Sequence, residues 1–442
     1  MQETPKKELS LLDSTCLIVG IIIGTGIYTM SPDIAKGAGG GWGVMAIWLV
    51  GGLISLCGAL GYAELASAYP REGGDYVYLS RAFGRWAGFL FGWVRMTIVQ
   101  PGDIALMAFF FAVYAAVLYD PLPEGGQAAT LRLYACAAVV VLTAINIIGV
   151  KAGKWAQNVL TILKALGLLA IVFVALAAPP GRAAAAAAES RPWSLALILV
   201  LFAFGGWNEM AYVAAEVKNP GRNILRALVL GTAAVTALYL LVNAAFLYTL
   251  GYEGLAMSSA PAADSIAAAL PAAGGRIISA MICLSALGVA NGLVLTGARI
   301  SYAVGAEHRA FRALGQWHPR TGTPLRALLV QGAIAVTLIL VLGSFVEAVL
   351  YTAAPVYLFF VATSAALIVL RVKDRGTERP YRVTAYPVPV ILFAAVCGFL
   401  LYSAVTYKPL ISAAATGILL LGLPIYWLTS RRGAPAAPGG GP

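Results

Sequence analysis

Two stretches of the sequence decide the fold: residues 16–30 (CLIVGIIIGTGIYTM) and residues 197–217 (LILVLFAFGGWNEMAYVAAEV). Both are apolar enough to lie in a lipid bilayer. Glycines interrupt each stretch near its middle, as Gly24-Thr25-Gly26 in the first and Gly205-Gly206 in the second. The two stretches therefore predict membrane helices whose backbone is unwound part-way across the membrane.

The composition of the whole chain agrees with a membrane protein. Of its 442 residues, 60% are hydrophobic and only 11% are charged, whereas soluble domains are about 25% charged. The apolar residues come in runs of roughly 20, the length of a membrane-spanning helix. These features exclude a soluble enzyme, a disordered chain and a nucleic-acid-binding protein. They also exclude an outer-membrane barrel, whose strands alternate in hydrophobicity. The predicted fold class is an all-α polytopic membrane protein.

Apolar windows predict the number of membrane helices. There are twelve, at residues 14–34, 43–68, 86–117, 132–150, 158–178, 193–216, 226–250, 276–302, 326–343, 348–370, 386–406 and 409–428. The connections between them are short, so the sequence predicts no soluble domain.

The orientation follows from the distribution of lysine and arginine. If the N-terminus is cytoplasmic, 22 of the 30 Lys and Arg residues fall on the cytoplasmic side and six on the other. Because twelve spans is an even number, the C-terminus is then cytoplasmic as well. The net charge of +11 thus marks the cytoplasmic face and predicts no nucleic-acid partner.

The twelve spans divide into two blocks of five and a final pair. Residues 14–178 form the first block and residues 193–370 the second, each beginning with a broken span. Since five is odd, the second block has the opposite orientation in the membrane. Residues 386–428 hold the last two spans, between a cytoplasmic tail at 1–13 and a disordered tail at 429–442. Glycine-interrupted spans at matching places in two halves are typical of a transporter's central binding site.

The broken helices suit a particular ligand chemistry. The half-helix that starts near Gly26 presents free N–H groups and a positive dipole end, which favour a carboxylate. Carbonyl groups at the ends of the preceding half-helices favour an ammonium group. A zwitterionic amino acid carries both charges. The alternative is that the glycines only allow close helix packing, since Gly20 and Gly24 form a G-x-x-x-G pair.

Six strings across the chain resemble the amino acid–polyamine–organocation superfamily, and most of all the L-type amino acid transporters and their prokaryotic relatives. The strings are LLDSTCLIVGIIIGTGIY (11–28), YAELASAYPREGGDYVYLSRAFG (62–84), LFAFGGWNEMAYVAAEVKNPGRNI (201–224), ALYLLVNAAF (237–246), ALGVANGLVLTGARISY (286–302) and ERPYRVTAYPVPV (378–390). The resemblance implies a LeuT-type fold, a 5+5 inverted repeat with two further helices. It also implies sodium-independent exchange of amino acids.

The resemblance also implies which residues bind the substrate. The span 1 break would hold the carboxylate, the backbone of the span 6 break would receive the amino group, and Phe202 would close over the substrate from outside. The residues concerned are Ile22, Gly24, Thr25, Gly26, Ile27, Phe202, Ala203, Phe204, Gly205, Trp207 and Asn208.

Two residues match coupling or gating positions of the family. Lys164 matches a lysine of the fifth span that takes the place of a sodium ion, and Tyr239 matches a tyrosine of the seventh span near the inner substrate region. We expect the Lys164 ammonium to bridge the first span to its neighbours. The alternative is that its side chain reaches back to the inner membrane surface.

Several charged residues within the spans depart from the family pattern. Gln100 stands where several relatives carry arginine, and Glu209 stands where relatives often have an aromatic or small polar residue. Arg95 and Asp103 are eight residues apart, on roughly one face of a helix, so we interpret them as a structural pair. For Glu209 we expect helix capping and dipole compensation, with a counter-charge for a cationic substrate as the alternative.

The remaining expectations concern partners and function. The loop at residues 119–130 (YDPLPEGGQAAT) has no cysteine, so no disulfide-linked heavy subunit is expected. The five cysteines lie in apolar runs without metal-ligand spacing, and we expect no metal, cofactor or enzymatic activity.

The sequence predicts a multi-pass protein of the inner or plasma membrane. It would be a sodium-independent exchanger of neutral L-amino acids, with a proton-coupled amino acid or polyamine carrier as the alternative.

Overall fold

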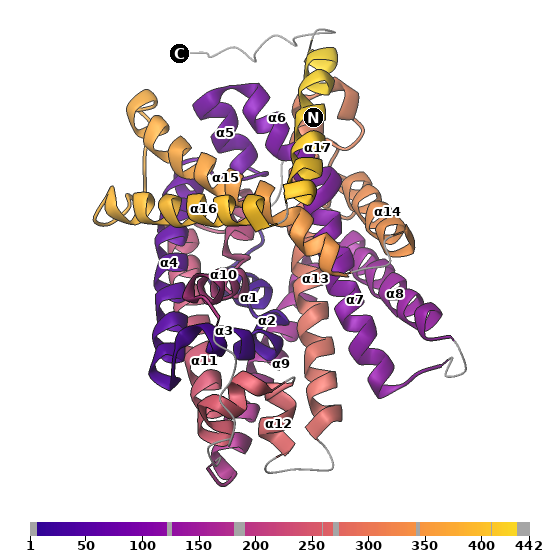
Figure 1. The fold of residues 1–442 in the computed structure, drawn as a ribbon. Helices are drawn as coiled ribbons and strands as arrows, with labels where there is room; N and C mark the ends of the chain where they lie inside the picture. Colours follow the sequence, from indigo (N-terminus) through magenta and orange to yellow (C-terminus); the bar gives the residue numbers. More distant parts are fainter. Residues whose placement is uncertain are drawn as a thin grey trace.

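The computed structural model describes residues 7–121, 126–180, 191–258, 260–267, 274–341, 345–407 and 409–430. Residues 1–6 and 431–442, at the outer ends of the two predicted tails, lie outside the described part. Every named element within it is helical (Figure 1). In chain order these are α1 (Leu11–Ile22), α2 (Gly26–Thr29), α3 (Ser31–Ala38), α4 (Gly41–Ala68), α5 (Asp75–Phe83), α6 (Arg85–Val94), η1 (Arg95–Val99), α7 (Gln100–Leu118), α8 (Gln127–Ile148), α9 (Val150–Ala177), α10 (Trp193–Ala203), η2 (Trp207–Glu216), α11 (Pro220–Met257), α12 (Pro261–Ala267), α13 (Gly274–Glu307), η3 (Arg309–Phe311), α14 (Leu325–Val341), α15 (Phe345–Lys373), α16 (Val388–Tyr407) and α17 (Pro409–Ser430).

Each of the twelve predicted windows overlaps an apolar helical segment. In the described part, nine segments are long and apolar enough to cross a membrane, and three further apolar helices, in α14, α16 and α17, are shorter. The direction of α16 could not be read from the sequence. In Figure 1 it lies across the bundle, whereas α4, α11 and α13 run along it.

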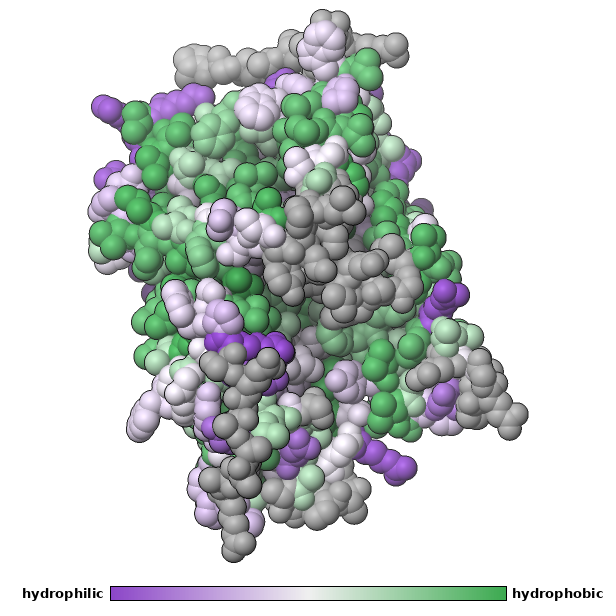
Figure 2. Space-filling model, viewed as in Figure 1, coloured by the Kyte–Doolittle hydropathy of each residue, from purple (hydrophilic) through white to green (hydrophobic). Residues whose placement is uncertain are grey.

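The outer surface of the bundle is apolar. The face in Figure 2 is mainly hydrophobic, and large side chains such as Trp42, Phe173 and Leu428 are more than half exposed. A water-soluble monomer rarely exposes so much contiguous apolar surface. Lipid is the environment that such a surface requires.

The first span is broken where its glycines predict. Ser10 and Asp13 form a capping box that starts α1, with the Ser10 amide donating to the Asp13 carboxylate over 2.9 Å. The helix ends at Ile22, and α2 begins at Gly26 after a non-helical turn. The break leaves two short helical pieces in place of one continuous span.

The second break joins helices of different kinds. The α-helix α10 ends at Ala203, and Gly206 has a left-handed φ of 109°, which strongly favours glycine. The rest of this span, η2, is a 3-10 helix of ten residues, unusually long for that conformation. A Cβ at Gly206 would lie 2.5 Å from Ile21 Cγ2, so the two breaks pack directly against each other.

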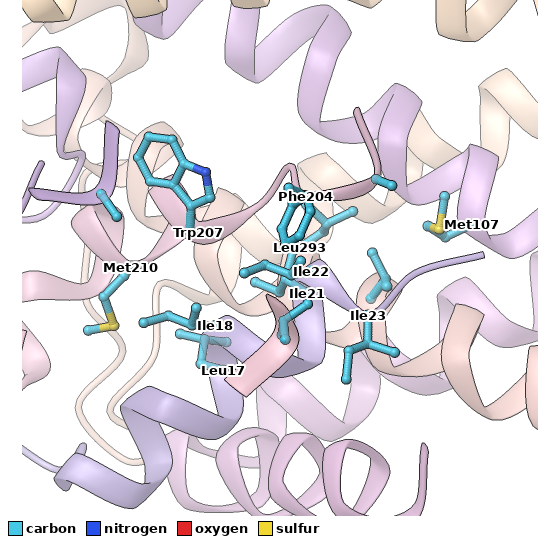
Figure 3. Close-up of a cluster of buried hydrophobic side chains, with 14 of the residues drawn as sticks. Leu17, Ile18, Ile21, Ile22, Ile23, Met107, Phe204, Trp207, Met210 and Leu293 are labelled. Carbon is cyan, nitrogen blue, oxygen red and sulfur yellow. The ribbon is translucent and has the colours of Figure 1, made fainter. Parts of the chain in front are cut away.

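The broken spans lie at the centre of the molecule. α1 packs on α9, α11, α13 and η2, and its side chains Leu17, Ile18, Ile21 and Ile22 gather with others from η2 and α13 in Figure 3. Gly20 allows the approach of α9, since a Cβ there would lie 2.1 Å from Thr161 Oγ1. Gly24, by contrast, has nothing closer than 3.7 Å. Of the G-x-x-x-G pair, Gly20 alone is required by close packing.

Candidate functional site

A cavity of about 200 Å³ lies where the two breaks meet. Residues of seven further helical segments line the rest of the cavity: α4, α5, α6, η1, α7, α13 and α15. The breaks and their flanks contribute Ile21, Ile22, Gly24, Thr25, Gly26, Leu201, Phe202, Ala203, Gly205, Gly206, Asn208 and Glu209. The two interruptions, about 180 residues apart in sequence, therefore form one site.

Free backbone amides face this site from the first span. The amide of Gly24 donates to the Ile22 carbonyl over 2.7 Å. The amides of Thr25, Gly26 and Ile27 donate to no acceptor in the described chain. Unpaired amides at the start of a half-helix are suited to a carboxylate.

Free carbonyls lie on the second span. The amides of Phe204 and Gly205 donate back to Val200 and Phe202 over 3.0 Å. The carbonyl oxygens of Phe204 and Gly205 accept no hydrogen bond from any described residue. The site thus offers donors on one break and acceptors on the other, the two groups that an α-carboxylate and an α-ammonium need.

The predicted binding residues divide into those that line the cavity and those that lie behind it. Eight line it: Ile22, Gly24, Thr25, Gly26, Phe202, Ala203, Gly205 and Asn208. The side chains of Ile27 and Phe204 are fully buried, and Phe204 packs on Trp48 and Tyr239. Trp207 does not line the cavity but stacks on the lining residue Phe360, with 5.7 Å between ring centres.

Tyr239 connects the two breaks from behind. Its hydroxyl donates to the Ile22 carbonyl over 2.9 Å and lies 3.3 Å from the Ala203 carbonyl. The side chain is fully buried. One phenol therefore ties the last residue of α1 to the last residue of α10.

Lys164 lies on the other side of the first break. Its ammonium donates to the Gly20 carbonyl, to the Ile23 carbonyl over 2.9 Å and to the Ser285 carbonyl over 3.3 Å. The residue is 1% exposed, so the side chain does not reach the membrane surface. The Lys164 nitrogen thus joins α9 to the end of α1 and to α13.

Glu209 forms a buried ion pair with Arg95. Its carboxylate also accepts from Thr296 over 2.5 Å and from Gln100 over 3.3 Å, and η2 has no side-chain cap. The expected capping role of Glu209 is therefore wrong, because these side chains of η1, α7 and α13 occupy its carboxylate.

The predicted pairing of Arg95 with Asp103 is also wrong. Arg95 begins η1, a π-helical segment of five residues. The carboxylate of Glu209 on the neighbouring span, and not that of Asp103, lies within ion-pair distance of the Arg95 guanidinium. Arg95 turns to Glu209 and lies over the Tyr212 ring, 5.1 Å from its centre. Asp103 lines the cavity with no ion pair or hydrogen bond to any described residue.

Sequence reasoning missed the contribution of α5. Asp75, at its start, lines the cavity and accepts hydrogen bonds from Tyr62 and Thr363, both over 2.5 Å. Gly73 and Gly74 before it have positive φ and lie against Ala303 and Tyr212. The sequence Gly73-Gly74-Asp75 marks a turn followed by an acidic residue. It does not indicate that this loop folds back into the bundle.

A buried ion pair lies at the C-terminal end of η2. Arg299 Nε donates to Glu216 over 2.6 Å, and both side chains are 1% exposed. Beside them the Leu9 amide donates to the Glu216 carbonyl over 2.9 Å, which joins the chain before α1 to the end of η2.

The chain belongs to the amino acid permease family, whose profile matches residues 9–428. It is thus a multi-pass membrane transporter of the amino acid–polyamine–organocation superfamily and not an enzyme.

Individual relatives are similar over nearly the whole chain. The serine/threonine exchanger SteT of Bacillus subtilis is 32% identical over 97% of this chain and 98% of its own length. The human large neutral amino acids transporter small subunit 2 is 31% identical, over 96% of this chain and 80% of its own length. The mouse b(0,+)-type amino acid transporter 1 is 30% identical, over 91% and 84%. These relatives place the chain among the L-type transporters and their bacterial relatives.

Proposed function

We propose that this protein is a sodium-independent exchanger of neutral L-amino acids that works by alternating access. The observation that carries the proposal is the cavity between the free amides of Thr25 and Gly26 and the free carbonyl of Gly205. These groups complement the two charges common to all α-amino acids. The names of its relatives, two of them large neutral amino acid and serine/threonine carriers, support neutral substrates and exchange.

Independence from sodium rests on Lys164. Its ammonium already binds the carbonyls at the end of α1 and on α13. A sodium ion beside it would meet strong like-charge repulsion in a medium of low dielectric constant. We assign Lys164 and Tyr239 to a network that holds the first span in place.

We infer that the structure represents an outward-facing state. Phe202, the proposed outer gate, lines the cavity and is 39% exposed. The opposite end of the same span is held by the buried Glu216–Arg299 pair. Alternating access would require Phe202 to close over the substrate and the Glu216 end to open.

The membrane arrangement that accompanies this function is a 5+5 inverted repeat. Residues 14–178 and 193–370 form the two repeats, and 386–428 the last two of twelve spans. Both termini face the cytoplasm, and the protein lies in the inner or plasma membrane. No cysteine occurs in residues 119–130, so we propose that no heavy subunit is attached by a disulfide there.

A thermal-shift screen of the twenty amino acids and of polyamines on purified protein tests the substrate class. Neutral amino acids should stabilise the protein, and polyamines should not.

The carboxylates of Asp75 and Asp103 on the cavity wall favour a second candidate, a proton-coupled carrier. Acidification of the proteoliposome lumen driven by substrate uptake would support that candidate over exchange.

A further inference from the structure

Beyond the two breaks, the cavity has a charged wall that the binding of an α-amino acid backbone does not use. Four of its described lining residues carry charged side chains: Asp75, Arg95, Asp103 and Glu209. Three are acidic and one is basic, so the wall has more acidic than basic side chains. The remaining lining is mostly apolar or backbone. A substrate held by the breaks would direct its side chain away from them, and this wall is the polar surface available to it.

Two of the three carboxylates are already occupied. Glu209 is bound by Arg95, Thr296 and Gln100. One oxygen of Asp75 is bound by Tyr62 and Thr363. Asp103 has no partner in the described chain and is partly open to the cavity. A carboxylate in a largely apolar cavity is costly unless a donor reaches it.

Buried groups next to it also lack partners. Arg95 Nε and Asp75 Oδ2 have no hydrogen bond in the described chain, although the two residues are 6% and 1% exposed. Polar atoms buried in this way normally find a partner. These two atoms are themselves closed off from the cavity, so the free acceptor that this wall presents to a ligand is the Asp103 carboxyl.

We propose that Asp103, with the Arg95–Glu209 pair beside it, forms a side-chain subsite that selects amino acids whose side chain donates a hydrogen bond. This inference rests on the proposed amino acid transport. Threonine and valine have nearly the same shape, but only threonine carries a donor. A site built to bind a hydroxyl discriminates strongly against the analogue without it, because its own polar groups are left unpaired. An ionised acidic side chain brings no donor to the Asp103 carboxyl and is therefore excluded.

Thermal-shift titration of the purified full-length protein tests this subsite with threonine, valine, lysine and glutamate as probes. Threonine should bind at least about tenfold more tightly than valine, and glutamate should not bind. Equal affinities for threonine and valine, or binding of glutamate as tight as that of threonine, would overturn the inference. The native protein alone therefore decides it, whether or not a variant folds.

Variants assign the effect to Asp103. In Asp103→Leu the ratio of threonine to valine affinity should fall to about one; a ratio that stays at the native value would refute the role of Asp103. Asp103→Asn retains an acceptor oxygen and removes the charge. It should therefore keep the preference for threonine, while any binding of lysine that depends on charge falls. Asp33→Leu replaces an exposed carboxylate on α3, outside the cavity lining, and should leave the ratio unchanged.

The failure of this inference can be told apart from failure of the proposed function. If no amino acid shifts the melting temperature or is exchanged, the proposed function itself fails. If amino acids bind but threonine and valine bind equally, only the subsite fails.

Discussion

The Lys164 ammonium donates to the carbonyl oxygen of Ile23 over 2.9 Å, at the point where the first span leaves its helix. The same nitrogen binds carbonyls on α1 and α13. The backbone at the break is thus held by a side chain of the protein itself.

Lys164→Ala should impair transport. The substitution removes one donor from the carbonyls of Gly20, Ile23 and Ser285, although the Ile23 carbonyl keeps the Ser285 hydroxyl over 2.9 Å. A buried group that is left unsatisfied costs about 1–3 kcal/mol. We expect a lower melting temperature and a large loss of exchange in proteoliposomes. Lys154→Ala is a suitable control, since that lysine is more exposed and bonds Asp13 in the first turn of α1, away from the break. Full exchange activity of Lys164→Ala would contradict this role.

Gly26→Leu should weaken substrate binding. A Cβ at this position would already lie 3.3 Å from Ala203 Cβ on the facing break, and a larger side chain would cover the free amides. Gly398→Leu is a matched change, because nothing lies within 4 Å of a Cβ there. Binding by thermal shift should fall in the first variant and persist in the second. Native affinity in a well-folded Gly26→Leu protein would remove the first break from the site.

Phe202→Ala should lose transport more than it loses insertion or stability. Phe202 lines the cavity and is 39% exposed, so its ring has room to close over a ligand. Burial of such a ring stabilises the closed state of the transporter by about 1.5–3 kcal/mol. The alanine variant loses this stabilisation. Phe173→Ala, at a 70% exposed position on α9, provides the comparison. Exchange at the native rate in Phe202→Ala would leave Phe202 with a packing role only.

Arg299→Met should destabilise the protein. It leaves Glu216 as an uncompensated buried charge, and breaking one side of a buried pair costs about 3–5 kcal/mol. Adding Glu216→Gln to Arg299→Met should restore part of the melting temperature. If both single and double variants melt at the native temperature, the pair does not hold this end of η2.

Acid stability should depend on His308, which lies in the loop after α13. Burial, with a smaller contribution from the Arg85 charge, lowers the pKa of His308 from 6.5 to about 4. The folded protein therefore holds the ring neutral, and the unfolded chain takes up a proton first. Stability contributed by the neutral ring is complete above pH 6.5 and is lost as the pH falls toward 4.

His308→Phe should flatten this acid dependence, because a ring without a titrating group can pack on Phe89 and Tyr426 in the same place. Melting temperatures at pH 7 and pH 4.5 provide the measurement. An equal drop in the native and variant proteins would assign the acid sensitivity to other groups.

Much of the fold could be predicted because apolar run length and glycine position are local properties. The helix breaks at Gly24 and Gly206 lie where the glycine pattern predicts them, and both border one cavity. The partners of charged residues could not be predicted in this way. Arg95 pairs with Glu209 on another span, and the spacing of charges along one helix does not predict a contact between two helices. Asp75 reaches the cavity only because its loop folds back into the bundle.

Exchange in proteoliposomes without sodium tests the central claim most directly. Proteoliposomes containing the purified protein would be loaded with an unlabelled neutral amino acid, and uptake of the labelled one measured in sodium and in choline buffer. The account predicts equal uptake in the two buffers and no uptake without internal amino acid. Uptake that required sodium, or that proceeded equally into empty vesicles, would contradict it.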